Sequence, residues 1–143
     1  MIDMEKFPSH VEDIANKIIS IDGKATVSWA AEKMIKNKIG CIVVTENDVP
    51  VGIVTKSDLL CRVIVADKDP KKTEISSIMS SPLITIPKEK PILDAIRELR
   101  NKNISRLIVT DNGKPYGLVS ETDLIKAVQF ASLTSFKSLL KPY

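Results

Sequence analysis

The sequence predicts an α+β fold made of two tandem β-α-β-β-α units with a C-terminal helix. Three observations lead to this prediction: the two halves of the chain repeat each other, each copy alternates β-type runs with a helical apolar stripe, and turn residues fall at matching places. The chain has 143 residues, of which 43% are hydrophobic and 27% charged, as is typical of a globular domain.

The repeat is clearest where PVGIVTKSDLL at residues 50–60 returns as PYGLVSETDLI at residues 115–125. Residues 18–64 align with residues 83–129 without a gap, and 13 of the 47 paired positions are identical. Ordinary composition would give roughly three identities by chance. A single unit of about 60 residues would bury too little apolar surface to be stable alone, so we expect the two units to share a core.

Each copy begins with a short apolar run typical of a strand, at Ile18–Ile21 and at Leu83–Ile86. A helix is predicted next, because apolar residues recur at the i, i+3, i+4 and i+7 positions of one helical face. These residues are Val27, Ala30, Ala31 and Met34 in the first copy and Ile92, Ala95, Ile96 and Leu99 in the second.

A hairpin and a second helix complete each copy. The runs Cys41–Thr45 and Leu107–Thr110 predict a strand, the polar segments ENDVP and DNGKP a turn, and Pro50 and Pro115 the first residue of the next strand. The second helix is expected to bury Leu59, Leu60, Val63 and Ile64 in one copy, and Leu124, Ile125 and Val128 in the other.

The remaining segments divide the chain into residues 1–66, 67–129 and 130–143, which we expect to form one compact domain. The first range holds an N-terminal lead-in and the first unit, and the second holds the second unit after the charged linker ADKDPKKTEISS. That linker is expected to enter a short helical segment before Pro82. The third range has apolar residues at helical spacing and is expected to form a final helix.

Composition also bears on location and partners. The formal net charge of +3 comes from 21 basic and 18 acidic residues without a long run of one sign, so a nucleic-acid partner is not favoured. We find no membrane-length apolar run and no signal-peptide core, which favours a cytoplasmic location. Cys41 and Cys61 fit small buried hydrophobes, and the single histidine, His10, has no neighbours that would make a metal or catalytic site.

The repeated hydroxyl and carboxylate allow two interpretations. Thr55–Asp58 and Ser120–Asp123 both match a helix capping box, which by itself explains the two residue types. A helix N-terminus also attracts anions, and a carboxylate can accept hydrogen bonds from both hydroxyls of a ribose. Gly52 and Gly117 lie inside a predicted strand, where glycine indicates the close approach of another group to the backbone.

With these motifs, their flanks and the lead-ins Val11–Ile14 and Ile75–Met79, residues 11 to 129 resemble a tandem pair of CBS domains, the family named for cystathionine beta-synthase. The resemblance implies two units related by a pseudo-twofold axis, with packed sheets, helices outside and two clefts. It also implies that the clefts bind an adenosine-containing ligand such as AMP, ADP, ATP or S-adenosylmethionine, and that the chain forms a homodimer.

The resemblance further implies residues for each cleft. Asp123 and Ser120 would hold the ribose and the sugar-phosphate end, and Arg106 would bind phosphate, for which a permanently charged guanidinium is well suited. The first cleft comprises Ser20, Ala25, Ile39, Gly40, Ser105, Arg106, Ser120, Thr122 and Asp123. The second comprises Cys41, Thr55, Lys56, Ser57, Asp58, Thr85 and Ile104.

The second cleft departs from the family pattern. Cys41 stands where the other copy has Arg106, and Lys90 stands where the first copy has the small Ala25. Lys56 could supply charge in place of the arginine. We therefore expect the two clefts to be inequivalent, with the Asp123 cleft the better phosphate binder.

These observations favour a non-catalytic regulatory module that senses an adenosine-containing ligand and signals to a partner protein. The alternative is an interaction or dimerisation module without a ligand, and direct nucleic-acid binding has only the basic pI of about 8.8 in its favour. An enzyme is not expected, because the sequence has no Gly-rich phosphate loop with its lysine, no nucleophile and base pair and no metal-ligand spacing.

Overall fold

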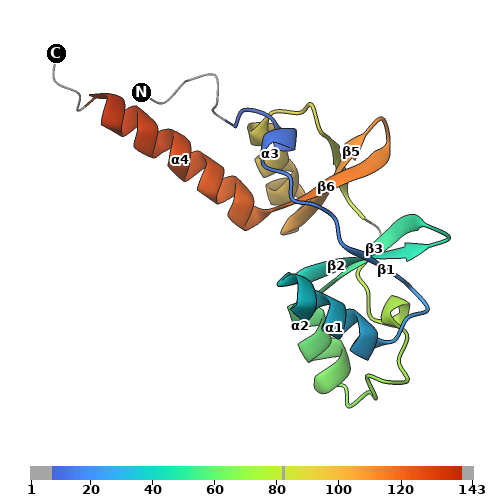
Figure 1. The fold of residues 1–143 in the computed structure, drawn as a ribbon. Helices are drawn as coiled ribbons and strands as arrows, with labels where there is room; N and C mark the ends of the chain where they lie inside the picture. The colour runs from blue at the N-terminus through green and yellow to red at the C-terminus, as the bar shows by residue number, and fades with distance from the viewer. Residues whose placement is uncertain (1–7, 82, 140–143) are drawn as a thin grey trace. The chain divides into compact units, whose positions relative to one another are not determined.

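The chain folds into two compact α+β units, each with its own three-stranded sheet (Figure 1). The computed structural model describes residues 8–81 and 83–139, with side chains to residue 133. One unit comprises residues 18–83, and the other combines the N-terminal segment with residues from Ile84 onward. The predicted α+β fold of two repeated units is therefore confirmed.

The unit of residues 18–83 is built on the sheet order β1-β2-β3. Strand β1 pairs parallel with β2, and β2 pairs antiparallel with β3. The π-helical turn η3 extends the short helix α2, and the 3-10 turn η4 lies in the segment that follows. The elements are β1 Ser20–Asp22, α1 Val27–Asn37, β2 Cys41–Glu46, β3 Val49–Thr55, α2 Lys56–Leu59, η3 Leu60–Ile64 and η4 Ile75–Ser77.

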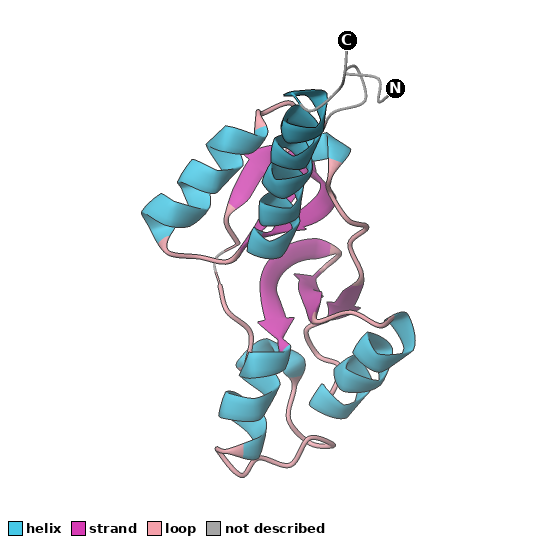
Figure 2. Cartoon of the chain, turned by 90° about the vertical axis from the view of Figure 1, so that its left-hand side faces the viewer, coloured by secondary structure: helices cyan, strands magenta, loops and turns pink. Residues whose placement is uncertain are grey.

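The other unit repeats this plan with the sheet order β4-β5-β6. Its elements are η2 Val11–Asp13, β4 Thr85–Pro87, α3 Ile92–Lys102, β5 Arg106–Asp111, β6 Lys114–Ser120 and α4 Glu121–Leu139. Figure 2 shows the two helices of this unit beside its strands. The predicted C-terminal helix is present, but as the continuation of the second helix rather than as a separate element.

Local sequence signals explain where the helices and hairpins begin and end. The Thr26 hydroxyl accepts a hydrogen bond from the Trp29 N–H at 3.2 Å and so caps α1. Asn112 and Gly113, with positive φ angles of 50° and 81°, turn the chain between β5 and β6. Pro50 and Pro115 are the second residues of their strands rather than the first, and each sits where the strand register shifts.

Most of the buried apolar residues form two clusters, one in each unit. In the unit of residues 18–83, Ala30 and Met34 of α1 pack with Ile42 and Val54 of the sheet. In the other unit, Ala95 and Leu99 of α3, together with Leu124 of α4, make the matching cluster. The predicted apolar stripes of α1 and α3 therefore each face a cluster within their own unit, and a core shared by the two units stays a prediction.

The lead-in segments explain the repeated glycines. Asn16 exchanges two backbone hydrogen bonds with Leu118, each 2.8 Å long, and a Cβ atom at Gly117 would lie 2.8 Å from the Asn16 carbonyl oxygen. Ser80 pairs with Ile53 in the same way beside Gly52. The group that approaches each glycine is thus a segment of the chain itself. It also places residues 8–17 with the second repeat, whereas the sequence boundaries assign them to the first.

The second helices of the two repeats bury fewer residues than their apolar pattern predicts. Val63 and Leu124 are buried, but Leu60, Ile64, Ile125 and Val128 are 44–67% exposed, so the prediction of a continuous buried side is wrong. Cys61 is also exposed, contrary to expectation, while Cys41 is half-buried. A small sheet needs only a narrow stripe from each helix, which leaves the flanking apolar residues on the surface.

Candidate functional site

The candidate site lies where a hairpin strand ends and a helix begins, and it occurs once in each unit. Arg106 faces Ser120 across β5 and β6, and Cys41 faces Thr55 across β2 and β3. The carbonyl oxygen of Ser105 accepts a hydrogen bond from the first N–H of α4, that of Glu121, at 2.9 Å. Each unit therefore gathers at one edge the repeated hydroxyl and the residues next to it.

In the Asp123 site, which we define as Ser105, Arg106, Ser120, Thr122 and Asp123, one carboxylate oxygen receives three hydrogen bonds. Oδ2 of Asp123 accepts from the Ser120 N–H at 2.9 Å and from the Ser120 hydroxyl at 2.8 Å. The Asn16 side-chain amide donates to the same oxygen at 3.0 Å. Within the described part of the chain, no hydrogen bond or ion pair reaches the other oxygen, Oδ1.

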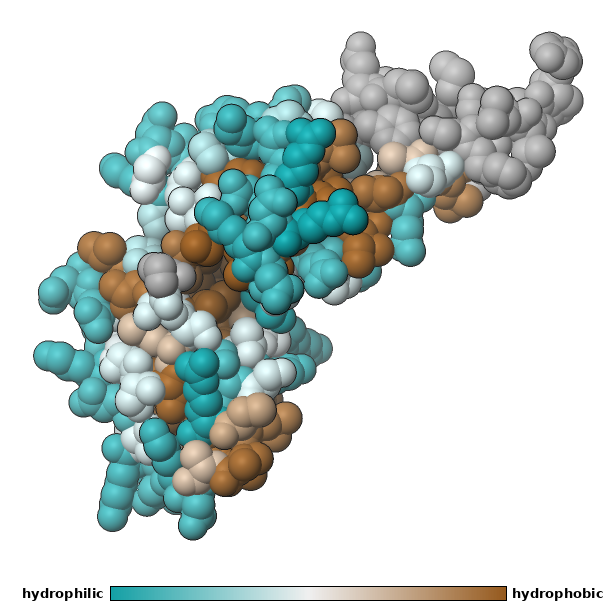
Figure 3. All heavy atoms as spheres, turned by 180° about the vertical axis from the view of Figure 1, so that it is seen from behind, coloured by the Kyte–Doolittle hydropathy of each residue, from teal (hydrophilic) through white to brown (hydrophobic). Residues whose placement is uncertain are grey.

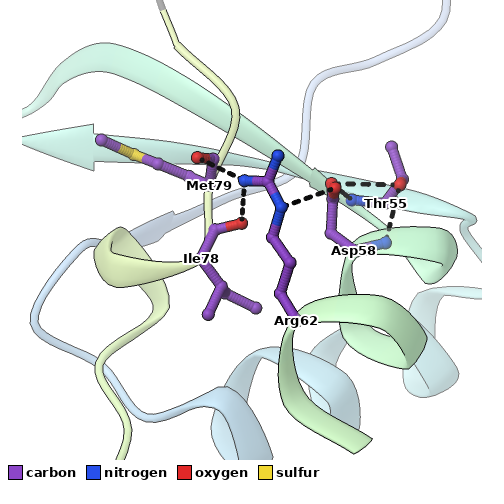
Figure 4. A network of polar contacts seen from close by, with 5 residues as sticks. All are labelled: Thr55, Asp58, Arg62, Ile78 and Met79. Carbon is purple, nitrogen blue, oxygen red and sulfur yellow. Dashed lines mark hydrogen bonds and ion pairs between the residues drawn. The ribbon is translucent and has the colours of Figure 1, made fainter. Parts of the chain in front are cut away.

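In the Asp58 site, defined as Cys41, Thr55, Lys56, Ser57 and Asp58, both carboxylate oxygens are engaged (Figure 4). Oδ2 of Asp58 accepts from the Thr55 N–H at 2.8 Å and from the Thr55 hydroxyl at 3.1 Å. Oδ1 lies 3.8 Å from Nε of Arg62, one helical turn later. The side chain of Asp58 is only 15% exposed, so little of this carboxylate faces water.

These bonds show that the capping interpretation is correct for both repeats. Asp123 N–H donates to the Ser120 hydroxyl at 3.2 Å, and Asp58 N–H donates to the Thr55 hydroxyl at 3.3 Å. In each pair, hydroxyl and carboxylate satisfy each other's backbone N–H groups, which a helix terminus otherwise leaves unpaired. Capping fixes the orientation of the carboxylate and does not use all of its acceptor positions.

Arg106 is half-buried at the start of β5, and its Nη1 donates to the Ser105 hydroxyl at 3.2 Å. Thr122 is exposed in the first turn of α4, and Ser57 and Lys56 are exposed in the first turn of α2. The residues expected around the phosphate end are therefore neighbours within each unit.

The other predicted residues lie in the first strand of each sheet and in the connections before and after the helix that follows it. Ser20 starts β1, and its carbonyl oxygen accepts from Nζ of Lys33 at 2.7 Å. Thr85 starts β4, where it lines a hollow of about 270 Å³ together with Lys90. Ala25, Ile39 and Ile104 pack against the apolar cluster of their own unit, and the Gly40 carbonyl oxygen accepts from the Lys56 N–H at 3.1 Å. The grouping of residues from both units into two clefts stays a prediction.

A comparison with protein-family models gives the family. The CBS-domain model matches twice, at residues 11–64 and 75–129. The chain belongs to the CBS-domain family. Members with paired CBS domains are generally regulatory modules, and many bind adenosine-containing ligands.

Several known proteins and solved structures resemble most of the chain. An uncharacterised protein of Methanopyrus kandleri is 35% identical over 134 residues, covering 92% of this chain and 68% of its own length. The structure of an uncharacterised conserved protein from Pyrococcus horikoshii aligns with a TM-score of 0.76 and 25% identity, covering 90% of this chain and 96% of that one. A hexameric CBS-CP12 protein from bloom-forming cyanobacteria has the same TM-score and identity, with coverages of 86% and 74%.

Sequence reasoning missed two residues of these CBS sites. Arg62 lies four residues after Asp58, and the rule that residues at i and i+4 meet on a helix could have indicated the pair. Asn16 contacts Asp123, which lies 107 residues later in the sequence, and no local sequence pattern indicates such a contact.

In the described part of the chain, no three His, Cys, Asp or Glu side chains gather as metal ligands would. No helix of that part is both long enough and apolar enough to span a membrane.

Proposed function

We propose that this chain is a non-catalytic regulatory module that binds an adenosine-containing ligand, namely AMP, ADP, ATP or S-adenosylmethionine, and passes the signal to a partner protein. A single observation supports this function most strongly. Oδ2 of Asp123 is held by three hydrogen bonds, whereas Oδ1 carries no contact within the described residues. Such a carboxylate is oriented in advance and can still accept from ribose hydroxyls.

The surroundings of Asp123 suit the rest of a nucleotide. The site opens at the N-terminus of α4, where the helix dipole favours a phosphate. Arg106, directly across from Ser120, can add a planar and permanently charged guanidinium. The Asp58 site has Cys41 at the corresponding position, so we propose that the Asp123 site binds phosphate better.

The signal would arise by linkage rather than by chemistry. A ligand shifts a protein between two states only as far as it binds one of them more tightly. The capped carboxylates are engaged in hydrogen bonds to their own helix, and neither has a histidine or a metal cluster beside it among the described residues. This favours a sensing role over a catalytic one, with the output carried by a partner.

The test is a thermal-shift titration with AMP, ADP, ATP, S-adenosylmethionine and guanine nucleotides. Binding at about 100 times Kd should stabilise the chain by about 2.7 kcal/mol and raise Tm by several degrees. Asp123→Asn should lose this rise, because the amide keeps an acceptor for the Ser120 N–H but no charge. Asp48→Asn, the same change at an exposed turn residue, is the control. If none of the adenosyl compounds raises Tm, the sensor function is wrong.

Arg106 gives a second readout of the same site. Arg106→Ala should weaken AMP or ATP binding while leaving adenosine binding nearly unchanged, since only the phosphate meets the guanidinium. Isothermal titration calorimetry would measure both affinities. Full retention of AMP and ATP affinity would remove Arg106 from the phosphate site.

Exposed apolar surface supports an interaction role as well, which is the second candidate. An apolar groove of about 460 Å³ runs between α3 and α4, lined in part by Ile96, Ile125 and Val128. Figure 3 shows apolar side chains, in brown, along α4 beside the grey end of that helix. We propose that this face pairs with a second copy of the chain. A stable dimer or protein partner together with no nucleotide effect would favour the interaction module over the sensor.

A further inference from the structure

Asp123 and Asp58 occupy matching positions of the repeat, but their carboxylates make different contacts. Asp123 keeps Oδ1 without a contact in the described residues, whereas Oδ1 of Asp58 faces Nε of Arg62 at 3.8 Å. The residue that matches Arg62 in the other repeat is Ala127, which has no charged group and packs in the apolar cluster. The arginine that faces Oδ1 in one repeat is therefore replaced by a buried alanine in the other.

Arg62 is fixed in place by three contacts from two directions (Figure 4). Its Nη1 donates to the carbonyl oxygens of Ile78 at 3.0 Å and Met79 at 3.1 Å, and its Nε faces Asp58. These carbonyls belong to the segment after η4 that pairs with β3 through Ser80. Because the carbonyls hold one side of the planar guanidinium, its Nε side is directed at the carboxylate.

We propose that Arg62 is an autoinhibitory residue that occupies Asp58 and so makes the Asp123 site the one that fills first. This inference rests on the proposed function, because it concerns ribose binding by the same repeated carboxylates. A ribose at Asp58 has to displace Nε of Arg62 or share Oδ1 with it, and a carboxylate only 15% exposed leaves little room to share. At Asp123 no such displacement is needed.

Two variants release Asp58 in different ways. Arg62→Ala gives the helix the residue of the other repeat and removes both the charge and the carbonyl contacts. Arg62→Gln removes the charge but keeps an amide donor for the carbonyls of Ile78 and Met79, so it remains informative if Arg62→Ala loosens that segment. Lys36→Gln removes one positive charge from the exposed face of α1 and serves as the control.

The experiment is calorimetric titration with AMP, in the natural chain and in the Asp123→Asn background, which isolates the Asp58 site. We expect one AMP per natural chain. In the Asp123→Asn background, Arg62→Ala and Arg62→Gln should each tighten AMP binding about two- to fivefold, the factor that corresponds to losing a partly exposed ion pair. Lys36→Gln should leave it unchanged, and adding Asp58→Asn should remove the gain.

The possible results separate this inference from the proposed function. Binding at Asp123 without any gain from the Arg62 variants would leave the sensor function standing and overturn the inference. Weaker binding in those variants would make Arg62 a phosphate contact, and two equal sites in the natural chain would also contradict autoinhibition. If neither the natural chain nor any Arg62 variant binds AMP, both proposals fail. Binding that appears only in the Arg62 variants would support the inference alone.

Discussion

Substituting alanine for Gly117 should destabilise the chain more than the same change at any other glycine with a negative or extended φ angle. A Cβ atom there would lie 2.8 Å from the Asn16 carbonyl oxygen and 2.9 Å from the Ala15 Cβ atom. Ordinary carbon contacts begin near about 3.5 Å. The lead-in segment would therefore have to move away from β6.

The loss in the free energy of unfolding can be worked out from the contacts that this movement strains. Overpacking of this kind costs about 1–3 kcal/mol. The two 2.8 Å hydrogen bonds between Asn16 and Leu118 would weaken as well, and each contributes about 1 kcal/mol net. We expect Gly117→Ala to lower the free energy of unfolding by about 2–4 kcal/mol and Tm by about 5–12 °C.

Two other glycines calibrate the result. At Gly52 a new Cβ would lie 2.5 Å from the sulfur and 2.8 Å from the Cγ of Met79, a flexible side chain that can rotate away, and 3.0 Å from the Ser80 carbonyl oxygen, which has to move only slightly. Gly52→Ala should therefore cost about 1–2 kcal/mol, less than Gly117→Ala. At Gly40 the nearest atom is 3.9 Å away, and Gly40→Ala should be neutral or stabilise by up to about 1 kcal/mol.

The assay is urea unfolding followed by circular dichroism, with Ala15→Gly added to Gly117→Ala as a partial rescue. Removing the Ala15 methyl group should recover part of the loss, because the contact with the Asn16 oxygen remains. The reasoning is refuted if Gly117→Ala is as stable as Gly40→Ala to within about 0.5 kcal/mol, which is the usual effect of an unimportant surface change.

Three further outcomes are expected. Ser120→Ala should lower the free energy of unfolding in urea by about 1 kcal/mol, because α4 loses its capping hydroxyl, and no change would contradict the capping role. Ile125→Glu combined with Val128→Glu should convert a dimer to a monomer in light scattering after gel filtration, since both side chains are exposed and line the apolar groove. Lys126→Gln, on the same helix but outside the groove lining, should not. The ion pair with Asp111, and more weakly the charge of Glu12, raise the pKa of Lys88 above 10.5, so its contribution to stability is complete below that pH and is lost as the pH rises through the raised pKa. The Tm difference between the natural chain and Lys88→Gln should therefore be constant from about pH 7 to 9 and shrink above about pH 10.5. A Tm difference that grows with pH would contradict a raised pKa of Lys88.

Sequence reasoning worked best where a local rule fixes the structure. The helical stripes around Ala30 and Ala95, the turn at Asn112 and the capping boxes at Thr55 and Ser120 all follow from spacing and residue type. Each of these depends on residues within one or two turns of the chain.

It failed where the outcome depends on what packs alongside. The spacing of Ile125 and Val128 is helical, but spacing alone cannot say how wide a stripe the neighbouring sheet will cover. The end of the repeat at residue 129 suggested a boundary, yet the residues that follow include no glycine or proline before Pro142, and α4 continues to Leu139.

The placement of the lead-in segment has a consequence for the order in which a ribosome can complete the two units. Residues 18–83 are contiguous, so that unit is finished while the second repeat is still being translated. The unit with the Asp123 site joins Asn16 to a carboxylate 107 residues further on, and Asn16 has to wait unpaired until the last helix emerges. The lead-in is thus synthesised before the unit of residues 18–83 but finds its place after it, and a cut after residue 17 would break the chain between Asn16 and the rest of the Asp123 site without interrupting the unit of residues 18–83.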